Sequence, residues 1–269
     1  MKMVSASKLR RAQNAIVKLR PYSSKLNEIL ESISEDNENS SNNPYNEQRN
    51  VEHVTIVLVS SNRGMCGSFN SNVIKMGLHL IHEKYADQYS KGNLSIITIG
   101  KRVTEYFQKR EYPVTVSDIV VTENPSYARS TEICSDVMKG FELRKTDHVE
   151  IVYNQFKNAA TQVLINEQFL PIKQKENSGK TLAVDYIFEP SKEIIIEQLV
   201  PKILRLQFYK SILDSVASEH GARMTAMHKA TDNAGEMIKA LKLSYNKARQ
   251  AAITNEISEI VSGANALKG

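Results

Sequence analysis

The segment SSNRGMCGSFNSN, residues 60–72, has the composition of a loop that could hold a phosphate. It follows an apolar run, VEHVTIVLVS, and precedes a helix-like segment, VIKMGLHLIHEKYA, so a strand, a glycine turn and a helix are expected in that order. In α/β proteins this arrangement often surrounds a phosphate with backbone N–H groups. Only Gly64 and Gly67 are present, however, and they complete neither G-x-x-x-x-G-K-[ST] nor G-x-G-x-x-G. The segment therefore favours a tight turn that packs the helix onto the sheet.

Other side chains could do chemistry, but their spacing argues against it. His220 and His228 lie eight residues apart on an expected helix, too far to share a metal as residues i and i+4 do, and both are expected at the surface. Cys66 is expected to be a small buried side chain. Asp232 and Glu236 lie one helical turn apart and are interpreted as salt-bridge partners of basic side chains instead of an acid/base pair. No catalytic constellation, metal site or cofactor site is expected.

The composition is that of a soluble protein. The chain has 269 residues, of which 41% are hydrophobic and 24% are charged. No apolar run is long enough to span a membrane, and the N-terminus lacks the apolar stretch of a signal peptide. Two cysteines cannot build a disulfide framework. These observations predict reduced thiols and a cytoplasmic location.

The net charge of +5 is unevenly distributed. Residues 1–30 carry seven Lys or Arg and one acid, and residues 200–269 carry ten basic and six acidic side chains, so the middle is acidic. Basic ends fit a solvated helix face, an acidic protein partner or nucleic acid. Aromatic residues are few near the termini, which disfavours nucleic acid.

The middle third alternates between strand-like and helix-like segments, which predicts a parallel or mixed α/β sheet. A helix with Pro125 at its start is expected before the last two strands, which look like a pair. The expected strands are residues 54–60, 94–100, 114–120, 148–156 and 161–172.

Both ends read as amphipathic helices. Residues 1–33 show helical spacing of apolar side chains, which Pro21 interrupts. After Pro201 the apolar positions recur in alternating steps of three and four, the pattern of a coiled-coil seam, in a helix of roughly 100 Å. Antiparallel pairing of the two helices is expected, with close approach at alanines of the seam. Because the N-terminal helix is shorter, part of the C-terminal helix must stay bare or meet another subunit. The seam alanines are Ala230, Ala234, Ala248 and Ala252.

These patterns divide the chain into four parts. A coiled-coil helix is expected at 1–33, a polar loop at 34–50, the α/β domain at 51–190 and the long C-terminal helix at 191–269.

Three blocks of the sequence resemble the γ subunit of bacterial F-type ATP synthase: MVSASKLRRAQ, SSNRGMCGSFNSNV and the segment from ASEHGARMTAMHKATDNAGEM to the C-terminus. The resemblance implies an α/β fold in which a long antiparallel coiled coil of the N- and C-terminal helices joins a central Rossmann-like α/β domain. It also implies a rotor shaft that couples ion flow to ATP synthesis in neighbouring β subunits and regulates ATPase activity. The implied partners are α, β, ε and the c-subunit ring, with no cofactor, no nucleic acid and membrane contact only through partners. The implied location is peripheral, at the cytoplasmic face of the plasma membrane.

Site residues also follow from the resemblance. Arg249, Gln250 and Thr254 match positions that contact β, and Met1 and Lys8 match the facing part of the N-terminal helix. Contact with the c ring and ε is expected where the long helix leaves the α/β domain. The residues expected there are Leu199, Ile203, Arg205 and Tyr209.

The chain departs from the family at its N-terminus. Family members begin with about twenty more residues, so we expect an upstream start and, in its absence, an unpartnered stretch at 253–267.

Two alternatives are a coiled-coil scaffold with other partners and a nucleotide-dependent α/β enzyme with a helical arm. The missing phosphate motif disfavours the enzyme, and the specificity of the C-terminal block disfavours a generic scaffold.

Overall fold

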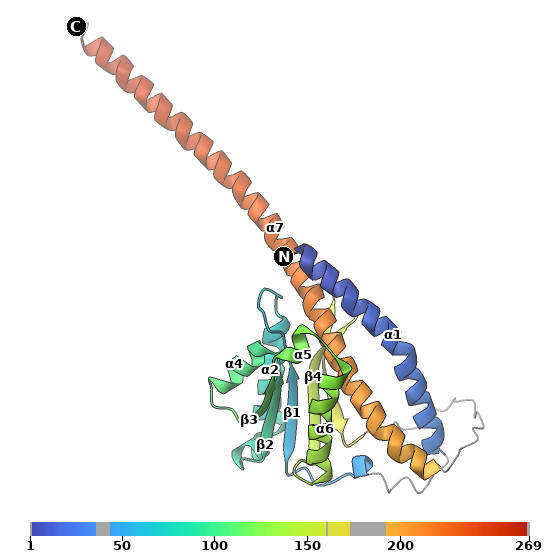
Figure 1. Ribbon diagram of the computed structural model, residues 1–269. Helices are drawn as coiled ribbons and strands as arrows, with labels where there is room; N and C mark the ends of the chain where they lie inside the picture. The colour runs from blue at the N-terminus through green and yellow to red at the C-terminus, as the bar shows by residue number, and fades with distance from the viewer. Residues whose placement is uncertain (1, 36–43, 160, 173–191, 268–269) are drawn as a thin grey trace. The chain divides into compact units, whose positions relative to one another are not determined.

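The computed structural model describes residues 2–35, 44–159, 161–172 and 192–267 (Figure 1). Met1, the central part of the predicted polar loop and the end of the predicted α/β domain lie outside these residues. Within the described ranges, no helix combines the length and the apolar character that crossing a membrane requires.

A five-stranded mixed sheet has the order β3-β2-β1-β4-β5. The strands β1, β2, β3 and β4 run parallel, and β5 pairs antiparallel with β4. Val57 of β1 is aligned with Ile97 of β2 and with Ile151 of β4. This confirms the predicted α/β class. The strands are β1 Val54–Val59, β2 Leu94–Ile99, β3 Val114–Asp118, β4 His148–Phe156 and β5 Gln162–Leu170.

Helices cover both faces of the sheet, and every residue of the mainly apolar strand β1 is buried (Figure 1). Val57 and Val59 point to the face covered by α6 (Tyr127–Glu142) and α7 (Lys192–Ala266). Ile56 and Leu58 point to the other face, where α2 (Phe69–His79) and α4 (Lys101–Gln108) pack. The continuous apolar run is the pattern of a strand buried on both sides.

Short elements connect these layers, and the structure corrects the sequence analysis at two points between them. The third strand ends at Asp118, whose carboxylate accepts a hydrogen bond from the Val121 N–H and so starts a helical turn in place of the strand. Pro125 precedes the N-cap Ser126 of α6 and is not in the first helical turn. The short elements are η2 Pro44–Asn46, the π-helical η3 Leu80–Lys84, α3 Ala86–Ser90 and α5 Val120–Glu123.

The N-terminal helix α1 (Lys2–Glu35) runs antiparallel to the first part of α7 (Figure 1). Leu9, Ala12 and Ile16 pack with Leu213 and Ala217 of α7, and further along α1 an apolar contact involves residues near 203–206. The pairing is therefore antiparallel, as predicted. Both helices continue through their internal prolines, at positions 21 and 201.

Packing divides the chain into two compact units, residues 1–225 and 226–269. The second unit is the last part of α7, and nearly all of its described residues are exposed. The seam alanines expected to meet α1 are therefore exposed, because α1 packs on an earlier part of the seam. The predicted four-part division follows secondary structure instead of packing and stays a prediction.

Candidate functional site

The loop that raised the phosphate question lies at the point where the strand order reverses. β1 and β4 are neighbours, and their connections leave to opposite sides of the sheet. In doubly wound folds the crevice outside these carboxyl ends holds the ligand. Residues 60–68 follow β1 at this position.

The loop is held by its own side chains. Asn70 Oδ1 accepts hydrogen bonds from the Ser61 N–H and the Ser61 hydroxyl, both at 3.0 Å. Cys66 is 1% exposed, and burial raises the pKa of its thiol. Met65 and Gly67 have positive φ angles of 62°, so the chain reverses sharply between them. The expected tight turn with a small buried cysteine is confirmed.

The loop presents carbonyl oxygens to a cation of the chain itself. Arg223 of α7 is 7% exposed, and its Nη2 donates to the carbonyl oxygen of Arg63 at 3.1 Å and to that of Gly64 at 3.4 Å. Its Nη1 donates to Glu219 Oε1 at 2.5 Å. A phosphate loop does the opposite, because its N–H groups point at an anion. The polarity here is suited to a guanidinium.

The last part of β4 and the loop that follows it hold the same helix. The Ser218 hydroxyl donates to the Asn154 carbonyl at 2.9 Å, and the Thr225 hydroxyl donates to the Ala159 carbonyl at 3.3 Å. A side chain at Gly221 would place its Cβ 3.1 Å from the same Ala159 oxygen, so the close approach depends on glycine. We call this set of contacts the collar. Its members are the carbonyls of Arg63, Gly64, Asn154 and Ala159 and the α7 residues Ser218, Glu219, Gly221, Arg223 and Thr225.

His220, next to the collar, corrects an expectation. Its side chain is half-buried instead of lying at the surface, and Arg223 Nη1 is 3.4 Å from its Nδ1. Burial, followed by the nearby charges of Arg223 and Lys8, lowers the pKa of His220 to about 4, so the ring is neutral at physiological pH. His228 is exposed, as expected, and pairs with Asp232 at 2.9 Å.

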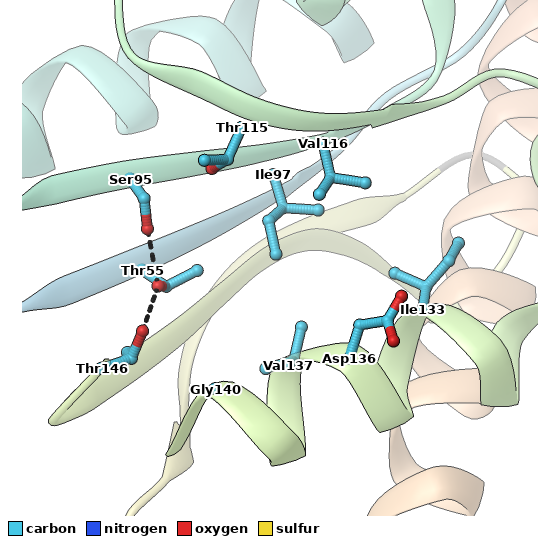
Figure 2. A pocket seen from close by; sticks show the side chains of 10 residues that line it. All are labelled: Thr55, Ser95, Ile97, Thr115, Val116, Ile133, Asp136, Val137, Gly140 and Thr146. Atoms are coloured by element: carbon cyan, nitrogen blue, oxygen red, sulfur yellow. Dashed lines mark hydrogen bonds between the residues drawn. The ribbon is translucent and has the colours of Figure 1, made fainter. Parts of the chain in front are cut away.

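A small cavity lies between the sheet and α6, on the face shown in Figure 2. It measures about 120 Å³, and the Thr55 hydroxyl hydrogen bonds to Thr146 at 2.9 Å and to Ser95 at 2.7 Å along its wall. Sites for small organic ligands are typically about 300–1,000 Å³, so a nucleotide does not fit. Among the described residues, no group of His, Cys, Asp or Glu side chains could hold a metal ion.

Comparison with known proteins decides the family. The sequence profile described as ATP synthase matches residues 1–267. The chain is 50% identical to the ATP synthase gamma chain of Cytophaga hutchinsonii, over 99% of this chain and 92% of that protein. It is 49% identical to the ATP synthase gamma chain of Christiangramia forsetii, over 100% of this chain and 92% of that protein. The chain belongs to the ATP synthase gamma chain family. It is a gamma subunit of the central stalk of an F-type ATP synthase, and the scaffold alternative is not favoured.

Solved structures agree with the fold of a gamma chain. A chain from the central stalk and c ring of the Tetrahymena thermophila mitochondrial ATP synthase superposes with a TM-score of 0.64 at 20% identity, covering 86% of this chain and 97% of that one. A chain of the Euglena gracilis mitochondrial ATP synthase gives 0.60 at 17% identity, covering 97% and 95%.

The residues predicted to couple the gamma chain to β lie on exposed surface. Lys8 on α1 and Arg249, Gln250 and Thr254 on α7 are exposed. The Thr254 hydroxyl donates to the Gln250 carbonyl at 2.9 Å, one turn earlier on the helix. Lys8 belongs to the first unit and the other three to the second. Met1 lies outside the described residues.

The residues predicted to contact the c ring and ε, at the foot of the gamma chain, already have contacts within the chain itself. Ile203 is buried against Leu26 of α1, and Leu199 packs at the edge of the same cluster. Tyr209 meets Tyr127 edge-on, with 5.7 Å between ring centroids. Arg205 is half-buried. A contact of these four residues with the c ring or ε stays a prediction.

The sequence analysis missed the collar. Glu219 and Arg223 have the i, i+4 spacing of a helical ion pair and stand among small residues, Ser218 and Gly221, which is a signal of close packing. That signal does not reveal the partner, because the accepting carbonyls are about 160 residues away in the chain.

Proposed function

We propose that this gamma chain is the rotor shaft that couples ion-driven rotation to ATP synthesis in neighbouring β subunits, and that it regulates their ATPase activity. The exposed apolar stripe on residues 226–267 carries the proposal. Large side chains are strongly exposed there, among them Leu241 at 62%, Tyr245 at 67% and Ile260 at 69%. Contiguous exposed apolar surface of this kind marks a protein interaction site. A helix packed on nothing is also held poorly by propensity alone. The remaining side chains are Met237, Ile238, Leu243, Ile253, Ile257, Val261 and Leu267.

The partner that fits this stripe is the inner wall of the α and β ring. Arg249 and Gln250 lie on the stripe-bearing segment and would meet β through charged and polar contacts, with Thr254 one turn later. Lys8 and Met1 would contact β from the facing part of the N-terminal helix. A hydrogen bond to a charged group contributes about 1.5–3 kcal/mol, so such contacts are strong enough to favour one conformation of β.

Catalysis is assigned to the partner subunits. The crevice that holds a ligand in related folds is occupied here by Arg223 and Glu219. This occupation supports a shaft without a nucleotide site or cofactor of its own.

The foot of the shaft is assigned to the α/β domain, predicted at 51–190, and to the start of α7. Arg205 and Tyr209 keep part of their surface exposed and would contact the c ring and ε. Leu199 and Ile203 would support that surface through their packing in the same part of the helix. These contacts would hold the subunit peripherally at the cytoplasmic face of the membrane.

Co-expression of the chain with its cognate α and β subunits tests the proposal. A stable complex with a single copy of this chain per ring and with ATP turnover is the expected result. If no complex forms, the experiment is repeated with an N-terminal extension of about twenty residues from a relative, and failure there too would overturn the rotor assignment.

A double substitution tests the coupling residues. Arg249→Ala with Gln250→Ala should lower the ATPase rate of the assembled complex by at least about tenfold, because the loss of polar contacts with β worth about 1.4 kcal/mol in total already corresponds to a factor of ten. Lys247→Ala, on the same exposed helix, is the matched control for loss of a positive charge. Normal turnover of the double variant would remove these residues from the coupling role.

A further inference from the structure

The collar gathers several directional contacts at one level of α7. Elsewhere on the sheet, α7 donates a hydrogen bond from Gln207 Nε2 to Glu167 Oε1 at 2.7 Å, among mainly apolar contacts. Below the collar, α7 lies on the sheet through apolar side chains such as Leu204, Phe208 and Ile212. Apolar contacts are non-directional and resist rotation of the helix only through shape. Hydrogen bonds weaken steeply when their angles change, so they resist it directly.

Arg223 is the strongest of these contacts. Its guanidinium is buried, and it donates to two successive carbonyls, of Arg63 and Gly64, while it is paired with Glu219. A planar guanidinium holds such partners in a fixed orientation, which a lysine ammonium does not. The loop at residues 60–68, to which Arg223 donates, is held in place by the two hydrogen bonds between Ser61 and Asn70.

The last part of β4 and the loop after it contribute contacts to the same stretch of helix. Thr225 and Gly221 meet the Ala159 carbonyl, and Ser218 reaches Asn154. Both strand ends that flank the reversal of strand order, those of β1 and β4, therefore contribute contacts to the collar.

We infer that the collar fixes the rotational position of α7 against the α/β sheet, and that Arg223 is a positioning residue for coupling ATP hydrolysis to ion pumping. The inference rests on the proposed rotor function. Torque applied to α7 reaches the sheet through these hydrogen bonds, so their loss lets the helix turn by a fraction of a step without moving the α/β domain.

The experiment separates this role from stability. Arg223→Met alone leaves Glu219 buried without its partner, which destabilises the fold for a separate reason. Glu219→Gln removes the carboxylate charge, but its amide oxygen can still accept from Arg223, whose bonds to the two carbonyls also remain. Glu219→Gln with Arg223→Met removes those bonds and leaves no buried charge. Comparison of the single with the double variant therefore isolates the contact between Arg223 and the loop.

Each variant is assembled into the complete ATP synthase with its cognate subunits in lipid vesicles, and ATP-driven ion uptake is divided by the rate of ATP hydrolysis. We expect this ratio to fall about twofold or more in the double variant and to stay within about a fifth of the wild-type value in Glu219→Gln. Arg223→Lys, which keeps the charge but replaces the planar guanidinium by an ammonium whose donors have no fixed orientation, should lie between them. Arg129→Met is the matched control, because Arg129 pairs with the buried Asp118 away from α7.

An unchanged ratio in the double variant would overturn the inference, even if its complexes were less heat-stable. An equal fall in Arg129→Met would also overturn it, because any weakened α/β domain would then uncouple. Failure of the proposed function looks different: the wild-type chain itself would form no complex or would give no ion uptake.

Discussion

Asp214→Asn should stabilise the folded chain at neutral pH by up to about 3 kcal/mol. Asp214 lies on α7 near α1, β4 and β5; it is 2% exposed, and its Oδ1 has no hydrogen-bond partner among the described residues. Burial raises its pKa from 3.8 to about 6, against the lowering effect of Lys210 and Arg20 and with a smaller raising effect of Glu167. The ionised carboxylate is therefore an unfavourable group in the folded state.

The sign of the pH dependence follows from proton binding. Between about pH 4 and pH 6 the folded chain holds a proton on Asp214 that the unfolded chain has lost, so the contribution of Asp214 to stability falls as pH rises through this window. The buried His220, whose pKa is lowered, contributes in the opposite direction, so the difference between wild type and variant is the quantity to compare. The benefit of Asn should be full above about pH 7 and should vanish near pH 4. Urea unfolding of the purified chain at both pH values measures it.

Asp232→Asn is the matched control, since Asp232 is exposed on the same helix and should change the free energy of unfolding little at either pH. If Asp214→Asn gave no gain at neutral pH, or an equal gain at about pH 4, the charge of this carboxylate would not be the cause.

Phe208→Ala should destabilise the chain by about 3–5 kcal/mol, the range for removal of a large aromatic side chain from a packed core. Phe208 is fully buried between α7 and the sheet, and its ring centroid lies 5.8 Å from that of Phe169 on β5. Its loss leaves a cavity in the cluster that joins α6, α7 and the sheet. The free energy of unfolding in urea is the measurement.

Tyr245→Ala provides the comparison on the same helix. Tyr245 is 67% exposed, so its removal should change the stability of the isolated chain by less than about 0.5 kcal/mol. Equal losses for the two variants would mean that the exposed segment is packed in solution.

The sequence predicted the sheet well because its strands carry strong local signals. A run such as VTIVLV is buried on both faces and reads as a strand without tertiary information. The same reasoning overextended the third strand, because Asp118 starts a turn through its side chain and propensity does not report that contact.

The pairing of the two long helices was predicted, but its register was not. The apolar seam continues along nearly all of α7, so periodicity alone does not say which part meets α1. The structure places the contact at positions such as Leu206 and Leu213 and leaves the later part of the seam exposed. Residue size does not distinguish the two parts, because large side chains such as Leu241 and Ile260 also lie on the exposed part.

The collar escaped prediction for a different reason. The destination of the Arg223 side chain depends on loops that are distant in sequence, and backbone carbonyls leave no trace in residue types. The family resemblance supplied the partners of the shaft but not this internal contact.

Arg223 also acts as a tethered competitor for the crevice at the strand ends. A group attached to the same chain has an effective local concentration of the order of millimolar or more, and it is present in every molecule. A free ligand entering this crevice would have to displace the guanidinium and strip Glu219 of its partner at the same time. Restoring a glycine-rich phosphate motif to residues 60–68 would therefore not by itself create a nucleotide site, since the helix would still occupy it.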